Sequence, residues 1–257
     1  MGILLEIKLG FWYNCCMKVF SLSDLHLSIN NPKPMNIFGP VWDNYVDEVI
    51  ANWQNVVEDD DIVLIAGDIS WAMRLEEAVV DIQWISQLKG KKVLLRGNHD
   101  YWWHSISALR NILPQNMYAV QNDCIRIGDM LVCGSRGWAT PDGANFPSAE
   151  DEKIYKREVL RLEMSLQKMQ GMRKETDTVV GMMHYPPFNV KFESSPFTRL
   201  FSQYGVKKVV YGHLHGNSAR ITRKVFRDGV EFFLTSCDSM SNKPLLIFDS
   251  EAPSKAE

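Results

Sequence analysis

The chain has 257 residues, which is enough for one large α/β domain with a substantial core. Its 46% hydrophobic and 23% charged residues are those of a globular protein, and no run approaches the about 18 apolar residues of a membrane helix. The formal net charge of −3 gives no electrostatic reason to expect nucleic acid or an anionic membrane as a partner.

The cysteines and the chain ends define the expected compartment and domain organisation. The five cysteines are odd in number and include no C-x-x-C pair, which argues against a disulfide framework and favours a reducing cytoplasm. Residues 1–16 are apolar but interrupted by Glu6 and Lys8, a poor signal peptide. We therefore expect an N-terminal extension over 1–16, one domain over 17–250 and a polar tail over 251–257.

Short runs rich in Val, Ile and Leu predict strands that are buried on both faces. Helical spacing of apolar residues predicts helices over 41–57 and 74–88, between the first three of these strands. This strand–helix alternation predicts that the first three strands are parallel neighbours or near neighbours. The predicted strands span residues 18–22, 62–66, 92–95, 178–183 and 208–211.

The middle and end of the chain have a different pattern. Short alternating runs over 117–133 predict antiparallel strands, and residues 137–147 predict a loop. A charged amphipathic helix is expected over 149–169, and a last strand over 245–248. Asp228-Gly229 between two runs predicts a hairpin of strands 219–226 and 230–234. The apolar side of the helix is assigned to Ile154, Leu160, Leu162 and Leu166.

Polar motifs follow the predicted strands, and they contain five of the six histidines. Strand ends are where α/β folds place their chemistry. Carboxylate, amide and imidazole groups together suit first-row divalent metals, so the pattern predicts a two-metal site. In chain order the motifs are Asp24-Leu-His26, Gly67-Asp68, Gly97-Asn98-His99-Asp100, His184 and Gly212-His213-Leu-His215.

Taken in this order, the motifs resemble the calcineurin-like metallophosphoesterase superfamily, of the bacterial predicted phosphohydrolase type. That superfamily has the pattern D-x-H, G-D, G-N-H-D/E, H and G-H-x-H. The resemblance implies a four-layer α/β/β/α sandwich with two mixed β-sheets. It also implies that Asp68 bridges two metals, that His99 faces the substrate as a general acid, and that Asp100 holds the His99 imidazole. The implied ligands are Asp24, His26 and His215 for the first metal and Asn98, His184 and His213 for the second.

The implied reaction is phosphoester hydrolysis, in which a metal-bridging hydroxide attacks phosphorus and His99 protonates the leaving group. Two divalent ions are expected, with Mn, Fe or Zn as candidates. The Asp-ending G-N-H-D motif favours a phosphodiesterase acting on a small phosphoester. A phosphomonoesterase, including a Ser/Thr protein phosphatase, is the alternative. The acidic balance disfavours a nuclease, and the complete ligand set disfavours a non-catalytic metal-binding interaction module. No P-loop motif is present.

Further residues are assigned to the substrate with alternatives left open. Arg136 follows a strand and could reach a substrate phosphate, or it could be an exposed structural arginine. His104 could contact substrate or simply open a helix. Two loops, residues 29–38 and 136–148, are expected to determine which substrate is bound.

Overall fold

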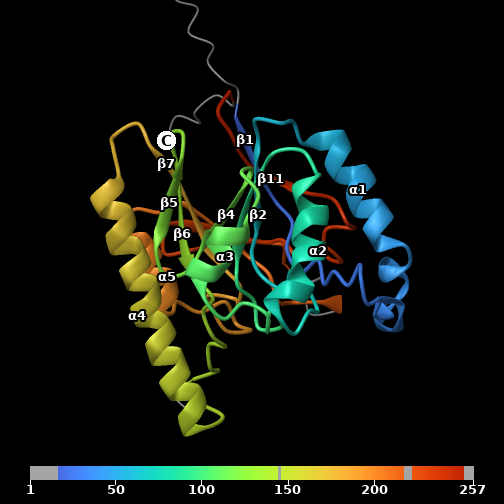
Figure 1. Cartoon of the computed structure of the whole chain (residues 1–257). Coiled ribbons are helices and arrows are strands. Elements are labelled where there is room, and N and C mark those ends of the chain that lie inside the picture. Colours follow the sequence, from blue (N-terminus) through green and yellow to red (C-terminus); the bar gives the residue numbers. More distant parts are fainter. Residues whose placement is uncertain (1–16, 144–145, 217–221, 252–257) are drawn as a thin grey trace, which may run out of the picture.

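The computed structural model describes residues 17–143, 146–216 and 222–251. Two β-sheets pack face to face, and helices cover the outer face of each sheet (Figure 1). The predicted α/β/β/α sandwich with two mixed sheets is therefore confirmed. Residues 1–16 and 252–257, which include the expected extension and most of the expected tail, lie outside the described residues.

The first sheet has the strand order β11-β1-β2-β3-β4. The pairs β1–β2 and β2–β3 are parallel, which confirms the predicted strand–helix alternation. The prediction for β4 was wrong in direction. It lies parallel to β3, because helix α3 returns the chain to the starting edge before β4 begins. The strands are β1 (Lys18–Ser21), β2 (Ile62–Ile65), β3 (Lys91–Leu95), β4 (Met117–Val120) and β11 (Leu245–Asp249), and α3 spans Ile106–Ile112.

The second sheet has the order β5-β6-β7-β8-β10-β9. β5 and β6 are antiparallel as predicted, whereas β6, β7, β8 and β10 are mutually parallel neighbours. The predicted hairpin forms between β9 and β10, and both Asp228 and Gly229 adopt positive φ in its turn. β9 begins only at Lys224, and residues 219–221 of the predicted strand lie outside the described residues. The strands are β5 (Cys124–Ile127), β6 (Met130–Ser135), β7 (Thr178–Met183), β8 (Lys208–Tyr211), β9 (Lys224–Arg227) and β10 (Val230–Leu234).

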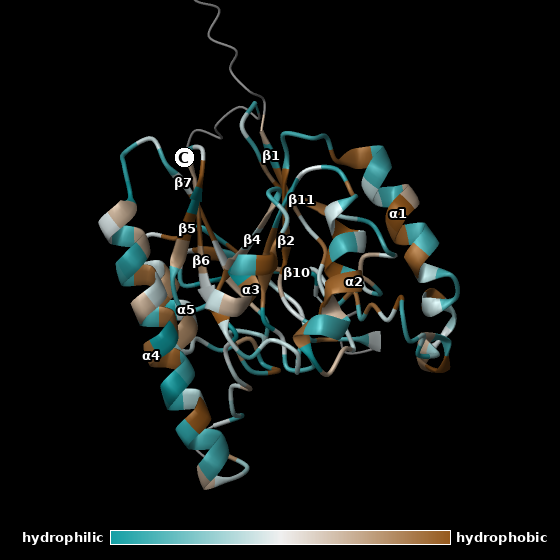
Figure 2. Ribbon diagram, viewed as in Figure 1, coloured by the Kyte–Doolittle hydropathy of each residue, from teal (hydrophilic) through white to brown (hydrophobic). Residues whose placement is uncertain are grey.

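Alternation along each strand divides the apolar interior into three layers. On β2, Ile62 and Leu64 pack between the sheets, whereas Val63 and Ile65 pack against helices. Because both of their faces are covered, central strands such as β2 and β7 are apolar along most of their length, as Figure 2 shows for the strands between the helical layers, whereas the edge strand β9 has exposed residues. Helices α1 (Tyr45–Val56), α2 (Leu75–Ser86) and α3 cover the first sheet, and α4 (Ala149–Met172) and α5 (Pro196–Gln203) cover the second.

Two predicted helices differ from the observed ones. The segment 41–57 begins within a 3-10 turn, η2 (Pro40–Trp42), which is separated from α1 by Asp43 and Asn44, and Asn44 has a φ of 52°. In α4, Leu160 is 61% exposed and was wrongly assigned to the apolar side. It lies two positions from buried Leu162, which places it on the opposite side of the helix.

Candidate metal centre

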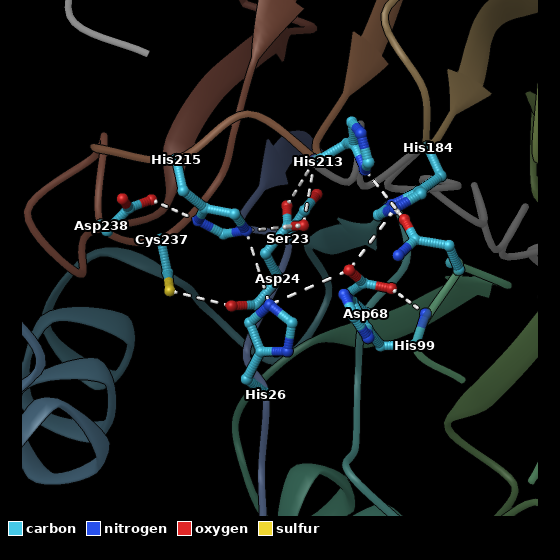
Figure 3. Close-up of polar contacts among 12 residues, drawn as sticks. Ser23, Asp24, His26, Asp68, His99, His184, His213, His215, Cys237 and Asp238 are labelled. Atoms are coloured by element: carbon cyan, nitrogen blue, oxygen red, sulfur yellow. Dashed lines mark hydrogen bonds and ion pairs between the residues drawn. The ribbon is translucent and has the colours of Figure 1, made fainter. Parts of the chain in front are cut away.

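The loops after β1, β2, β3, β7 and β8 meet at one edge of the two sheets and bring the predicted ligands together (Figure 3). A carboxylate oxygen of Asp24 lies 3.4 Å from Nε2 of His215. A carboxylate oxygen of Asp68 lies 3.5 Å from Nε2 of His184. The cluster comprises Asp24, His26, Asp68, Asn98, His184, His213 and His215.

The backbone of this cluster is held in an unusual conformation. Four of its residues adopt positive φ, which costs non-glycine residues on the order of 1–3 kcal/mol each. Backbone hydrogen bonds between loops hold that conformation: the Asp24 N–H donates to the Gly67 carbonyl, and the His213 N–H donates to the Asp24 carboxylate. The four residues are Asp24, His26, Asp68 and His213.

Two glycines allow the loops to approach the carboxylates. A Cβ added to Gly97 would lie 2.1 Å from an Asp68 carboxylate oxygen. A Cβ added to Gly212 would lie 2.2 Å from an Asp24 carboxylate oxygen. Both distances are far below van der Waals contact, so the glycines of the G-N-H-D and G-H-x-H motifs are required by space.

One group of electron-pair donors consists of Asp24, His26 and His215, whose ligand atoms all lie within 4.8 Å of one another. Nδ1 of His215 donates to the Asp238 carboxylate at 3.0 Å, which turns Nε2 toward Asp24. Burial disfavours the charged form of His215, but hydrogen bonds with Asp238 and Asp24 outweigh this and raise its pKa to about 10. In the absence of a cation, the His215 proton therefore balances the Asp24 charge.

A second group lies beside the first and contains Asp68, Asn98, His184 and His213. Nδ1 of His184 donates to the Ala66 carbonyl at 2.9 Å, because a carbonyl can only accept. Nε2 of His184 therefore presents its lone pair, 2.7 Å from Oδ1 of Asn98. Nδ1 of His213 lies 2.8 Å from the same oxygen. A cation between these atoms would be bound by the His184 lone pair and the Asn98 oxygen.

The electrostatics of the cluster also fit a cation. Burial and then the neighbouring Asp24 charge raise the pKa of Asp68 to about 8. Burial lowers the pKa of His26 to about 3 and that of His213 to about 4, so both imidazoles are neutral near pH 7. Nδ1 of His26 is buried without a hydrogen-bond partner. Neutral imidazoles beside buried carboxylates form a donor set that suits divalent ions.

The cluster opens into a cavity of about 490 Å³ with two unlike surfaces. The polar floor comprises His26, Asp68, His213, His215 and Asp238, and the apolar wall comprises Met35, Phe38, Trp42 and Trp71. Met35 and Phe38 lie in the 3-10 helix η1 (Met35–Phe38), so the predicted loop 29–38 does reach the cavity. The described part of loop 136–148 does not line it.

His99 also lines this cavity, at the junction of the floor and the wall. Its ring centroid lies 4.7 Å from that of Trp71 and 5.7 Å from that of His26. Its backbone N–H donates to the Asp68 carboxylate at 2.8 Å. Burial, followed by the nearby His184, lowers the pKa of the His99 imidazole.

Asp100 does not contact the His99 ring, contrary to the role expected for it. Its fully buried carboxylate accepts from the backbone N–H groups of Ile69, Ser70 and Gly97 and from the Trp102 indole. A carboxylate that satisfies four donors joins the loop after β2 to the loop after β3. Asp100 therefore positions the loop that carries Asn98 and His99, without touching the imidazole.

Neither of the two residues assigned to substrate with alternatives left open lines the candidate site. The Arg136 side chain lines a different cavity, although its backbone carbonyl accepts from the N–H of His184. The exposed His104 does not line the cavity of the candidate site. Arg136 was assigned because it follows a predicted strand and His104 because it lies five residues after His99, and the direction of each side chain was decided by packing that the sequence pattern does not contain.

Sequence reasoning missed Asp238 and the part of the apolar wall outside loop 29–38, which is Trp42 and Trp71. The Asp238 carboxylate accepts from the His215 ring at 3.0 Å and from the Gly216 N–H at 2.9 Å. It follows β10 in the run Thr-Ser-Cys-Asp238, a polar strand end of the kind that marked the other motifs, so it could have been found. The wall residues carry no local signal of this kind.

Comparisons with solved structures bear on the fold. No curated protein sequence matches the chain. Among solved structures, it is similar to phosphopantetheinyl hydrolase (PptH) from Mycobacterium tuberculosis, with 16% identity, a TM-score of 0.55 and coverage of 94% of this chain and 99% of the other. It is also similar to TT1561 of Thermus thermophilus, with 10% identity, a TM-score of 0.54 and coverage of 89% and 97%. At such identities these likenesses concern the fold alone.

No helix in the described part of the chain is long and apolar enough to cross a membrane.

The family itself follows from the sequence. The profile of the calcineurin-like phosphoesterases matches residues 17–217, which include all five motifs. The resemblance predicted from those motifs is thus confirmed, and the chain belongs to the calcineurin-like phosphoesterase family of metal-dependent hydrolases.

Proposed function

We propose that this protein hydrolyses small organic phosphoesters with two divalent metal ions, and that phosphodiesters are its preferred substrates. Bound at the cluster, Mn, Fe or Zn ions would lower the pKa of a water molecule and neutralise phosphoryl oxygens. Asp68 lies between His26 and His184, which suits a carboxylate shared by two ions. The proposed ligands are Asp24, His26 and His215 on one side and Asn98, His184 and His213 on the other.

His99 is proposed to protonate the leaving oxygen. It lies in the cavity, and its backbone hydrogen bond to Asp68 places it beside the proposed bridging carboxylate. Because burial lowers its pKa, the imidazole needs a nearby negative charge to hold a proton at neutral pH. The bound phosphoester anion supplies that charge, so His99 would become an acid when substrate is present.

The composition of the cavity is the observation that carries the preference for diesters. Its described lining residues include no lysine or arginine, and the apolar wall forms one side. A phosphomonoester dianion has one more negative charge than a diester, and the described lysine beside the cavity, Lys33, lies over the Trp71 ring and is not among the lining residues. A diester has a second organic group, which the wall of Trp42, Trp71 and Phe38 can cover.

The test is turnover of bis(p-nitrophenyl) phosphate against p-nitrophenyl phosphate by protein treated with chelator and then supplied with Mn²⁺. We expect Mn²⁺-dependent cleavage, with a higher kcat/KM for the diester. A higher kcat/KM for the monoester would replace the proposal with a phosphomonoesterase. Cleavage that survives complete removal of metal would contradict the metal-dependent reaction itself.

We also propose that the protein works in a reducing compartment such as the cytoplasm. The described cysteines Cys124, Cys133 and Cys237 are buried free thiols. Burial raises the pKa of each thiol, which keeps it protonated and unreactive. Cell fractionation would test this, and recovery of the protein outside the cytoplasmic fraction would contradict it.

A further inference from the structure

A second cavity, of about 200 Å³, lies between the ends of β3, β4 and β6 and helix α4. It shares no lining residue with the cavity of the candidate metal centre. Four arginines and one glutamate are its charged lining residues, which gives it a formal charge of +3. We call it the arginine pocket, and its charged residues are Arg96, Arg136, Arg157, Glu158 and Arg161.

Glu158 does not satisfy the arginines around it. Its carboxylate is 1% exposed and accepts from Arg161 at 2.7 Å through one oxygen. The guanidinium groups of Arg136 and Arg157 lie 3.8 and 3.7 Å from that oxygen, beyond hydrogen-bond distance. The other carboxylate oxygen and Nε of Arg96 are both buried without a hydrogen-bond partner. The pocket therefore brings together positively charged guanidinium groups, and not all of their N–H groups have a hydrogen-bond partner.

Such crowding is unfavourable without a counter-ion, because guanidinium groups in a partly buried site repel one another. Planar guanidinium donors match the paired oxygens of phosphate and carboxylate, and several of them converging favour an oxyanion with more than one negative charge. The volume holds several waters, at about 30 Å³ each, or one tetrahedral oxyanion. A nucleic-acid strand is too large for it.

We propose that the arginine pocket binds a phosphate-type oxyanion, separately from the candidate metal centre. The anion is either free inorganic phosphate or the phosphoryl group of a larger molecule. The pocket is connected to two of the five loops of the metal centre: Arg96 directly precedes Gly97-Asn98, and the Arg136 carbonyl accepts from the N–H of His184 at 3.1 Å. An anion held there would contact Arg96, in the loop that carries Asn98, and Arg136, whose carbonyl accepts from His184.

The test is calorimetric titration of the full chain, as purified, with inorganic phosphate. Arg157→Gln removes one guanidinium whose side chain is 47% exposed, so the fold should be kept. We expect it to weaken phosphate binding by about tenfold, the lower range for a charge-assisted hydrogen bond. Glu158→Gln removes the only negative charge of the pocket and should tighten binding. Lys153→Gln is the matched control, because it removes one exposed positive charge from the same helix.

The two variants must change the affinity in opposite directions. If Arg157→Gln binds phosphate as tightly as Lys153→Gln does, the arginine pocket is not an anion site. If a folded Glu158→Gln protein binds phosphate more weakly, the proposal is likewise overturned. Circular dichroism checks the fold, and if Glu158→Gln does not fold, the comparison of Arg157→Gln with Lys153→Gln decides alone. These variants should not change phosphate binding at the metal centre, so such binding does not account for a difference in affinity between them.

A second titration distinguishes the two sources of the anion. Phenylphosphonate carries a phosphoryl group on a bulky substituent that cannot be hydrolysed as an ester. Binding that Arg157→Gln weakens would show that the pocket accepts a phosphoryl group attached to a larger molecule. Arginine-dependent binding of phosphate alone would assign the pocket to the free ion. If Arg157→Gln weakens binding of neither probe, the proposal fails.

Discussion

The polar floor and the apolar wall of the candidate site differ in how firmly the fold holds them. Floor residues come from strand-end loops, and hydrogen bonds between loops fix four of the predicted ligands in left-handed conformations. The wall comes largely from two 3-10 turns, η1 and η2, and includes Phe38, which is 65% exposed. The candidate metal ligands, whose positions must be fixed, thus lie on rigid loops. The residues that would contact an organic group form an open surface.

This difference predicts two classes of variant. A change in the floor should alter metal content, because ligand positions set metal affinity. A change in the wall should alter KM while metal content stays the same. His99 lies between the two surfaces and should alter kcat without altering either metal content or the wall.

Asp68→Asn is the floor variant with the largest expected effect. A neutral amide bridges two cations poorly, so we expect loss of both ions. The loss of activity should exceed the roughly 10–100-fold typical of changes outside the ligand shell. Metal content by mass spectrometry, with kcat/KM on the diester, measures this. Asp142→Asn, in an exposed loop, is the control and should keep both. Two tightly bound ions in Asp68→Asn would contradict its bridging role.

His99→Ala should lower kcat by about 10²–10⁴-fold on substrates with poor leaving groups, because a general acid contributes that range. A good leaving group such as p-nitrophenolate needs little protonation and should show a smaller loss. His104→Ala, an exposed histidine outside the cavity, is the matched control. Loss of metal from His99→Ala would show that His99 is a ligand.

Asp238→Asn tests a residue that acts through His215. Without the carboxylate, Nδ1 of His215 has a weaker acceptor, so the ring is held less firmly and is less basic. We expect metal affinity to fall by about 10–100-fold, measured by competition with a chelator. The pKa of His215 in metal-free protein, followed by NMR, should fall from about 10. An unchanged metal affinity would show that Asp238 is only structural.

Phe38→Ala is the wall variant with the smallest expected effect. Removing a largely exposed ring should leave stability and metal content unchanged and raise KM for the aromatic diester by roughly five- to tenfold. Phe226→Ala, which removes a ring 69% exposed on β9, is the control. Equal KM values for the two variants would mean that the wall does not contact substrate.

Much of the fold could be predicted because its signals are local. Buried strands such as β7 and β8 were predicted with the observed bounds, and the Asp228-Gly229 turn predicted its hairpin. The order of the motifs indicated which loops meet. The direction of β4 was wrong because short alternating runs suggest antiparallel pairing, whereas the neighbour of a strand depends on how the preceding helix returns the chain.

The same distinction between local sequence signals and tertiary packing applies to the candidate site. The sequence by itself determined the identity and order of the candidate ligands, because residue type dictates what an atom can bind and strand ends dictate where it lies. Tertiary structure alone decided the contacts that cross between elements: Asp100 bonded to backbone groups, Arg136 turned into the arginine pocket, and Trp71 stacked on His26. These contacts join residues far apart in the chain or set the direction of a single side chain. Neither is encoded in hydrophobic period or motif spacing, since both depend on how separate elements pack.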